Sequence, residues 1–370
     1  MSGAGFDGGP EVEFDAAGDA AGAVLAQLSD RIRAATRDRL PLRIAGGDTR
    51  SAVLRPVPGQ LLRLAAYRGI LAYSPSELVI TARAGTPLAE IESALAARGQ
   101  MLGFEPPRFG AASTIGGVVA TGLAGPRRPY AGAVRDFVLG VRVMNGRGEV
   151  LRFGGQVMKN VAGYDVSRLM AGAHGTLGVI VDVSLRVLPR PAGECSVLWQ
   201  LAPDEALQRM TALARRPLAI AGLAYAEGVL RARLAGQSAA VDALIEVLAP
   251  DAVEPGLDFW EALRDLPTRT PREGQALWRF AVSPAAPPID LPGSWTIDWG
   301  GAQRWLETDV DDVRMHAAAA RAGGHAARLR GVGGASLPPL PPALLALHRA
   351  LKQAFDPAGV FNPGRLYGGL

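Results

Sequence analysis

Apolar residues recur at intervals of three or four positions in three segments of the chain, which is the spacing of one helix face. We therefore predict helices over 20–37, from Pro87 to the vicinity of Gly99, and over 343–355. The second helix has the clearest boundaries, because Thr86 offers an N-cap, Pro87 suits the first helical position and Gly99 suits a C-terminal glycine.

Strand patterns occupy the stretches between these helices. The predicted strands are 42–45, 78–81, the two arms of a hairpin within 138–152, and 179–187. The hairpin turns at Asn145-Gly146-Arg147-Gly148. Alternation of Val and Leu with more polar residues predicts that the last strand is buried mostly on one side. Pro189 and Pro191 end it, and we place a domain boundary there.

These elements predict an α+β fold built from several parts, since 370 residues exceed the usual size of one hydrophobic core. The predicted parts are a leader and helix at 1–37, a domain at 38–190 with subdomains 38–100 and 101–190, a smaller α+β cap domain at 195–335, and a C-terminal helix and tail at 343–370 that pack back on the first domain.

Composition adds limits on the function. Hydrophobic residues make up 48% and charged residues 20%, as in ordinary globular proteins. The net charge of +4 comes from scattered arginines, with lysine only at Lys159 and Lys352. Nucleic-acid-binding proteins usually gather positive charge on one stripe with interleaved aromatics. We therefore predict no nucleic-acid partner.

The cysteine count and the N-terminal residues bear on location. One cysteine, Cys195, cannot form an internal disulfide, hold an iron–sulfur cluster or build a Cys-rich zinc site. The first 19 residues lack a basic region followed by an apolar one, and no apolar run reaches the ~20 residues that span a bilayer. We predict a cytoplasmic protein, with any attachment to the inner face of the cell membrane made through partners.

Three glycine-rich stretches carry the candidate chemistry: 43–49, 110–136 and 159–180. Glycine, alanine, serine and threonine let the main chain approach a ligand closely, and exposed backbone N–H groups suit phosphate oxygens. The first stretch alone is compatible with a plain turn. The second is too long for an ordinary loop in a compact domain, which favours a function. Together they indicate a site for a phosphorylated ligand.

Two common nucleotide-binding motifs are missing from the sequence. No Gly-x-Gly-x-x-Gly lies between a predicted strand and helix, since Gly146-x-Gly148 is in the hairpin turn and Gly331-x-Gly333 precedes a proline-rich loop. No Gly-Lys-Ser/Thr phosphate loop occurs either. A flavin without a nicotinamide module is the better interpretation.

The order RIAGGDTR, GAASTIGGVVATGLAGPRRPYAGAVRDFVLGVRV, VMKNVAGYDVSRLMAGAHGTLGVI and FDPAGVFNPGRLY resembles the vanillyl-alcohol-oxidase family, whose FAD-binding domain is of the PCMH type. More closely, it resembles the smaller FAD-binding subunits of bacterial glycolate oxidases. The resemblance extends to DWGGAQRWL at 298–306 and to the C-terminal tail, and so covers nearly the whole chain. It implies a two-subdomain FAD-binding domain at 38–190 with a cap domain after it.

The resemblance also implies which residues bind FAD. The cofactor-binding residues would be Ala45, Gly46, Gly47, Asp48, Thr49, Gly110, Ser113, Thr114, Gly116, Gly117, Ala120, Thr121, Gly122, Gly125, Tyr130, Asp136, Gly175, Thr176, Gly178, Val179 and Ile180. In addition, residues 362–364 would return the tail to the flavin domain. Family members often attach FAD through a histidine after the first glycine pair. Asp48 stands there, so we predict non-covalent FAD.

Catalytic residues are harder to assign. The larger flavin subunits carry a metal-associated His-x-x-Gly-Asp-Gly-Asn motif that has no counterpart here, so no metal is predicted. Arg279 could pair with a substrate carboxylate and Tyr164 could touch substrate or flavin. Either side chain could equally be structural: Arg279 could point to solvent, and Tyr164 could belong to a buried turn.

The resemblance implies a role within a complex. The chain would be the FAD-binding subunit of a glycolate dehydrogenase, in which a larger FAD-containing subunit oxidises the small 2-hydroxy acid to glyoxylate and an iron–sulfur subunit passes electrons towards quinone. Two alternatives stay open. The chain could be a self-sufficient FAD-dependent 2-hydroxyacid dehydrogenase with Arg279 as carboxylate clamp, or an assembly subunit that has lost flavin.

Overall fold

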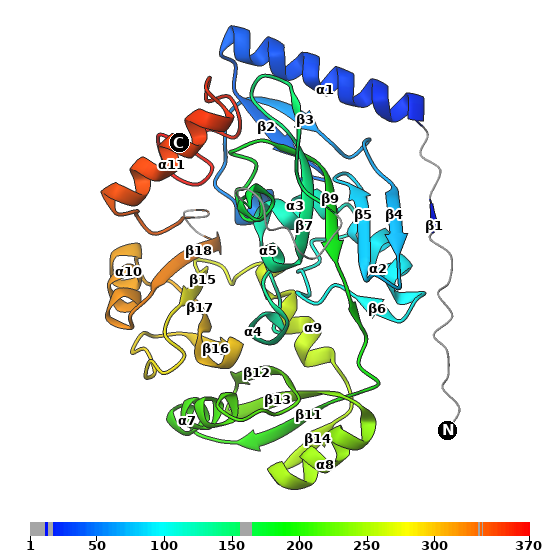
Figure 1. Cartoon of the computed structure of the whole chain (residues 1–370). Coiled ribbons are helices and arrows are strands. Elements are labelled where there is room, and N and C mark those ends of the chain that lie inside the picture. The colour runs from blue at the N-terminus through cyan, green and yellow to red at the C-terminus, as the bar shows by residue number, and fades with distance from the viewer. Residues whose placement is uncertain (1–11, 14–17, 156–164, 332–333, 335) are drawn as a thin grey trace, which may run out of the picture.

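The computed structural model describes residues 12–13, 18–155, 165–331, 334 and 336–370. Its main features are two antiparallel sheets, one of six strands and one of eight, which occupy different halves of the molecule (Figure 1). The chain crosses from the first sheet to the second between residues 189 and 193. The predicted α+β class is confirmed.

The six-stranded sheet has the order β1-β4-β5-β9-β7-β8. The elements of this half are β1 (Val12–Glu13), α1 (Gly18–Asp38), β2 (Leu42–Ala45), η1 (Ser51–Val53), β3 (Gln60–Arg63), β4 (Ile70–Ser74), β5 (Val79–Arg83), α2 (Leu88–Ala96), β6 (Gln100–Met101), α3 (Ile115–Thr121), α4 (Arg128–Ala131), α5 (Val134–Phe137), β7 (Val138–Met144), β8 (Val150–Gly154), α6 (Val166–Leu169), β9 (Val179–Arg186) and β10 (Leu188–Pro189). Strands β2 and β3 form a separate parallel pair. The six-stranded sheet draws strands from both sides of residue 100, so no sheet boundary falls at the predicted limit between subdomains.

The eight-stranded sheet has the order β14-β11-β13-β12-β16-β17-β15-β18. The elements of this half and of the C-terminus are β11 (Gly193–Gln200), α7 (Pro203–Ala214), β12 (Ile220–Ala226), β13 (Val229–Gly236), α8 (Ser238–Leu248), β14 (Ala252–Glu254), α9 (Asp258–Arg264), η2 (Leu266–Thr268), β15 (Ala276–Ala281), β16 (Ser294–Asp298), η3 (Trp299–Gly301), β17 (Gln303–Thr308), α10 (Asp312–Arg321), β18 (His325–Gly331) and α11 (Pro342–Phe355). Below, the part from β11 to β18 is called the cap.

Strand β9 differs from its prediction, because both of its faces are buried. Val181 and Val183 pack in the core, as the alternation requires. The polar positions are buried too. Asp182 forms an ion pair with Arg142 on β7, and the hydroxyl oxygens of Ser184 and of Thr81 on β5 are 2.8 Å apart. A central strand has neighbours on both sides, so its polar side chains find partners within the sheet.

The N-terminus of α2 also differs from its prediction. The N-cap is Pro87, without a side-chain cap. The hydroxyl of Thr86 instead donates to the carbonyl of Arg83 at 2.6 Å and accepts from the amide of Gly69 at 2.9 Å. Since these tertiary contacts occupy the hydroxyl, Thr86 joins the β5 end to a neighbouring loop and does not begin the helix.

The C-terminal segment returns to the first half of the chain. Val360 and Phe361 are buried in its core, and Phe361 forms a parallel bridge with Leu42 at the start of β2. Figure 1 shows α11 near β2, far along the chain from it but close in space. Consequently, the tail is part of the first half of the molecule.

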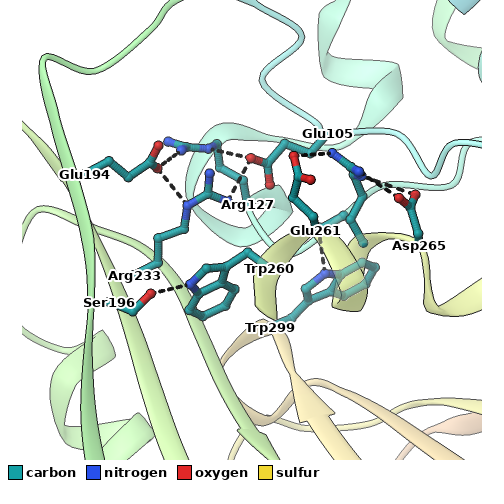
Figure 2. A network of polar contacts seen from close by, with 11 residues as sticks. Glu105, Arg127, Glu194, Ser196, Arg233, Trp260, Glu261, Asp265 and Trp299 are labelled. Carbon is teal, nitrogen blue, oxygen red and sulfur yellow. Dashed lines mark hydrogen bonds and ion pairs between the residues drawn. The ribbon is translucent and has the colours of Figure 1, made fainter. Parts of the chain in front are cut away.

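A ring of four buried charges joins the two halves (Figure 2). Glu105 and Arg127 come from the first half and Glu194 and Arg233 from the cap. Arg233 Nη1 lies 2.8 Å from Glu105 Oε1, and its Nε lies 2.7 Å from Glu194 Oε1. Arg127 contacts the same two carboxylates. Each positive group therefore touches both negative ones, and the ring links the cap to the first half.

Replacing Arg233 with methionine is expected to lower the free energy of unfolding by about 3 kcal/mol, because two buried carboxylates would then share one arginine. Urea denaturation of the purified chain measures this. The matched control is Arg272→Met in the cap, whose side chain is 77% exposed and 3.9 Å from Glu307. We expect the control to change stability by at most about 1 kcal/mol. Equal losses for both variants would show that the ring does not stabilise the protein.

Candidate cofactor site

A groove in the first half of the molecule brings together segments that are far apart in the sequence. It encloses about 740 Å³, counting the part that is open to solvent. Its walls come from 44–51 after β2, from α3, from the loop that leads into β9, and from the C-terminal tail. The glycines of the three stretches thus meet: Gly47, Gly117 and Gly178 all line this groove.

Several of these glycines leave no room for a side chain. A Cβ on Gly46 would collide with the Thr114 hydroxyl, and one on Gly47 would collide with the carbonyl oxygen of Ala112. On Gly116 it would lie 2.6 Å from the Cβ of Ala84, and on Gly178 it would lie 2.5 Å from Val143. The backbone at these four glycines is therefore packed against neighbouring segments too closely for any larger residue.

Most of the residues that the sequence assigned to the cofactor do line the groove. They are Ala45, Gly46, Gly47, Asp48, Thr49, Thr114, Gly116, Gly117, Ala120, Thr121, Gly175, Gly178 and Ile180. The loop after β2 has an unusual conformation at Asp48, whose φ is +60°. Asp48 Oδ2 lies 2.6 Å from Arg43 Nη1, and this ion pair neutralises its charge.

The other assigned residues have different places. Ser113 accepts a hydrogen bond from Arg50, Thr176 and Val179 are buried beside the groove, Gly122 ends α3, and Gly110 accepts from the amide of Ser113. Asp136 accepts from the amide of Ala133. Gly125 and Tyr130 face the cap. The carbonyl of Gly125 accepts a hydrogen bond from Trp299 Nε1 at 3.0 Å. The Tyr130 hydroxyl lies close to Gly300, since a Cβ added to that glycine would be 3.8 Å from it. These two residues lie at the contact between the halves and outside the groove lining.

Two arginines in the groove were not assigned from the sequence. Arg50 and Arg365 are each 6% exposed, and neither forms an ion pair with the described residues. Burial lowers the pKa of Arg50 to about 10. The sequence offered one clue to these two arginines: each directly follows a glycine-containing turn in the segments that resemble known flavoproteins. Such a segment does not show which of the nearby arginines is buried.

His174 is a further lining residue that the sequence analysis did not assign. Its φ is +54°, its amide donates to the carbonyl of Ala120, and its Nδ1 has no hydrogen-bond partner among the described residues. Burial and the nearby charges of Arg365 and Arg279 lower its pKa to about 4. The imidazole is therefore neutral at physiological pH.

The tail is attached to the groove by side-chain bonds. Asn362 Nδ2 donates to the carbonyl of His174 at 2.8 Å, and its Oδ1 accepts from the amide of Ile44 at 2.9 Å. Lys352 Nζ donates to the carbonyls of Thr176 and Phe361 and to Asp356 Oδ2, at 2.6–2.8 Å. The tail thus holds two walls of the groove together.

Of the two catalytic candidates, Arg279 is described and Tyr164 lies outside the described residues. Arg279 is in β15 of the cap, and its cross-strand neighbours are Trp305 and Ala327. No ion pair of Arg279 is found within the described ranges. Burial and the charge of Arg128 lower its pKa to about 10, and its own charge acts on His174. Arg279 therefore places a positive charge in the cap that acts on His174, although Arg279 is not among the residues that line the groove.

A buried carboxyl lies near this contact between the halves. Asp298 is 1% exposed, and burial raises its pKa to about 7, although it accepts from the Trp299 amide and from Gln303. The neighbouring Glu105 raises it further. Above that pH a charge is buried without a cation among its hydrogen-bond partners.

Stability is expected to decrease as the pH rises from about 4 to 7, because the folded state keeps the Asp298 proton that the unfolded state has lost. The variant Asp298→Asn should lose this slope and be more stable than the wild type at pH 8 by on the order of a few kcal/mol. Thermal unfolding at a series of pH values measures it, with Asp290→Asn at an exposed position as the control. A variant slope equal to that of the wild type would contradict the assignment.

The part of the chain that the structure describes has neither a metal-ligand cluster nor a membrane-spanning helix. Within it, no group of three or more His, Cys, Asp or Glu side chains is placed to hold a metal ion. None of the helices described is long and apolar enough to cross a membrane.

The fold and the groove define an FAD-binding oxidoreductase. Residues 22–154 match the model of the FAD binding domain, and residues 312–366 match that of the FAD linked oxidases, C-terminal domain. The chain belongs to the family of the glycolate oxidase subunit GlcE: it is 47% identical to that protein of Escherichia coli K12 over 343 residues, which cover 93% of this chain and 97% of the relative. The prediction that the cofactor is FAD is thereby confirmed.

More distant relatives match the FAD-binding half. Glycolate oxidase subunit GlcD of Bacillus subtilis is 31% identical over 39% of this chain and 30% of its own length, and a D-lactate dehydrogenase of Anaerostipes hadrus is 33% identical over 40% and 30%. Among solved structures, an alkyldihydroxyacetonephosphate synthase superposes with a TM-score of 0.64 at 16% identity, covering 91% of this chain and 74% of that one. The last match shows the fold alone.

Proposed function

We propose that this chain is the FAD-binding subunit of a glycolate oxidase complex that converts glycolate to glyoxylate. The observation that carries this proposal is the 47% identity with a glycolate oxidase subunit over nearly the full length of both chains. The groove supports it, because residues of three glycine-rich stretches and two buried arginines line it, and such a lining suits an anionic dinucleotide such as FAD.

Bound FAD supplies the two-electron chemistry of the oxidation. The residues of this chain hold and shield it. The glycine loops at 46–47 and 116–117 bring the main chain close to the cofactor, His174 offers a neutral imidazole, and the tail residue Asn362 joins the loop before β9 to β2.

The proposed partners are a larger FAD-containing subunit and an iron–sulfur subunit. With one cysteine, this chain cannot ligate a cluster itself. Electrons from glycolate would reach a cluster in the partner, and the complex would be cytoplasmic or attached at the inner face of the cell membrane through partners. The substrate is proposed to be a small 2-hydroxy acid.

Purification of the tagged chain together with its natural partners tests this function. We expect a yellow complex that contains FAD and iron and reduces a dye acceptor with glycolate. Removing this chain should abolish the activity. A complex that keeps full glycolate oxidation without this chain would contradict the proposal.

A second function is supported by Arg279, whose buried guanidinium has no carboxylate among the described residues. On this alternative the chain oxidises a 2-hydroxy acid by itself, and Arg279 holds the substrate carboxylate. The isolated chain would then reduce a dye with glycolate or D-lactate, and Arg279→Met would raise KM more than 10-fold at unchanged flavin content. An inactive isolated chain that becomes active with its partners favours the first function.

Non-covalent attachment of FAD follows from Asp48, which stands where a linking histidine would be and is paired with Arg43. We expect acid precipitation of the holoprotein to release all flavin into the supernatant. Absorbance of the supernatant and the pellet at flavin wavelengths measures the release. Yellow colour retained in the washed pellet would show a covalent bond at another residue.

A further inference from the structure

We propose that Arg50 and Arg365 are the two cationic ligands of the FAD diphosphate, so that the C-terminal tail supplies half of the charge that recognises this cofactor. The inference rests on the proposed binding of FAD. It assigns the electrostatic part of recognition to two side chains, beyond the glycine loops.

Arg50 is held at the groove by neutral groups. Its Nη1 donates to the hydroxyl of Ser113 at 2.9 Å and its Nη2 to the carbonyl of Pro107 at 3.3 Å. The guanidinium carbon lies 4.8 Å from the centre of the Phe109 ring, and Nε has no partner. A Cβ added to Gly117 would lie 3.3 Å from Nη1, so the charge is beside the α3 backbone that lines the groove.

Arg365 reaches the same groove from the other end of the chain. Its Nη1 donates to the carbonyl of Arg55 at 2.6 Å, and its Nε has no partner. The adjacent Asn362 fixes the tail between Ile44 and His174. Burial lowers the pKa of Arg365, and the charge of Arg43 lowers it further. This cation is therefore buried among neutral groups and another cation, with Asp48 as the nearby negative charge.

Two positive side chains in the groove, Arg50 and Arg365, have no negative side chain among the described residues to compensate them. Asp48 is paired with Arg43 at 2.6 Å, and His174 is neutral. Arg50 and Arg365 remain, and the described residues offer neither an ion pair. A buried cation costs several kcal/mol unless an anion compensates it. The diphosphate of FAD carries two negative charges, and arginine suits phosphate because its planar fork can donate two hydrogen bonds.

A purely structural role is the competing explanation, because Arg50 also connects the loop at 107–113 to the turn before η1. The two explanations differ in what they predict for charge. A structural role requires the hydrogen bonds alone, whereas a diphosphate ligand requires the positive charge. Glutamine keeps a donor without charge, and lysine keeps the charge without the fork.

The test uses the full chain freed of flavin and titrated with FAD, ADP and riboflavin by calorimetry. We expect Arg50→Gln and Arg365→Gln each to weaken FAD and ADP binding 10- to 100-fold and to leave riboflavin binding within twofold. Arg50→Lys and Arg365→Lys should recover at least part of the loss. The salt dependence of FAD binding should also be smaller in the Gln variants than in the wild type, because one screened charge is gone.

Arg272→Met, at an exposed cap position, is the control and should bind all three ligands as the wild type does. Equal weakening of FAD and riboflavin, or unchanged FAD binding in both Gln variants, would overturn the inference while FAD binding itself stands. If a Gln variant fails to fold, the Lys variant and the salt dependence of the wild type decide: no salt dependence overturns the inference. A wild-type chain that binds none of the flavins would instead overturn the proposed function.

Discussion

Asp356→Ala is expected to lower the free energy of unfolding by about 3–5 kcal/mol and to release FAD. Asp356 is 1% exposed, and its Oδ2 lies 2.8 Å from Nζ of the buried Lys352. It also accepts from the amides of Val360 and Phe361. Without Asp356, the ammonium stays buried beside carbonyl oxygens only, and two buried amides lose their acceptor.

The loss extends to the cofactor because the same residues attach the tail. Lys352 Nζ donates hydrogen bonds to the carbonyls of Thr176, in the loop before β9, and of Phe361, in the tail. When the tail detaches, Asn362 and Arg365 leave the groove with it. Urea denaturation and the flavin content of the purified chain measure the two effects.

The double variant Lys352→Met, Asp356→Asn gives a sharper test of this pair. A buried ion pair can often be replaced as a whole at little cost, whereas removing one partner leaves an uncompensated charge. We therefore expect the double variant to be more stable than Asp356→Ala. The control Asp30→Ala removes an exposed ion pair with Arg33 and should cost at most about 1 kcal/mol. A loss for Asp356→Ala as small as the control's would show that the tail is held by its apolar contacts alone.

Gly47→Ala is expected to reduce flavin content at least 10-fold and to destabilise the chain by about 1–3 kcal/mol or more. The new methyl group would occupy the position of the carbonyl oxygen of Ala112. Because that obstacle is backbone, a change of rotamer cannot relieve it. The loop at 110–113 must move, and Ser113, which Arg50 bonds, moves with it.

The matched control is Gly22→Ala in α1, where an added Cβ meets nothing within 4 Å. Alanine has a higher helix propensity than glycine, so we expect this control to be stabilised by up to ~1 kcal/mol with full flavin content. Visible absorbance and denaturation measure both variants. Full flavin content in Gly47→Ala would show that the loops are not packed against each other as described.

Local patterns in the chain predicted several elements of the first half and the final helix, and the glycine stretches carried the resemblance that implied FAD. The helix at 20–37, the hairpin at 138–152 and the final helix all correspond to observed elements. Glycines after a strand were informative because they can be required where another segment approaches the backbone closely, as the Thr114 side chain does at Gly46 and the Ala112 carbonyl does at Gly47. The resemblance to known flavoproteins depended on these glycine stretches.

The errors came from contacts between distant residues. Thr86 looked like an N-cap, but its hydroxyl accepts a hydrogen bond from the amide of Gly69 in a preceding loop. The polar positions of β9 looked solvent-facing, but Arg142 and Thr81 on neighbouring strands bury them. In both cases a tertiary partner outweighed a local preference, because one hydroxyl or carboxylate can satisfy only a few partners at once.

The amino-acid order alone predicted several elements and a glycine-rich site for a phosphorylated ligand, since these depend on residues close together in the chain, and the resemblance to known flavoproteins implied FAD. It could not show that Arg50, Arg365 and His174 meet in one groove, or that Lys352 ties the tail to the loop before β9. These features depend on burial and on charges that chain folding brings together over 100 to 300 residues. A solvent-exposed arginine and a buried arginine without an ion pair look the same in the sequence, because they differ only in the residues that surround them.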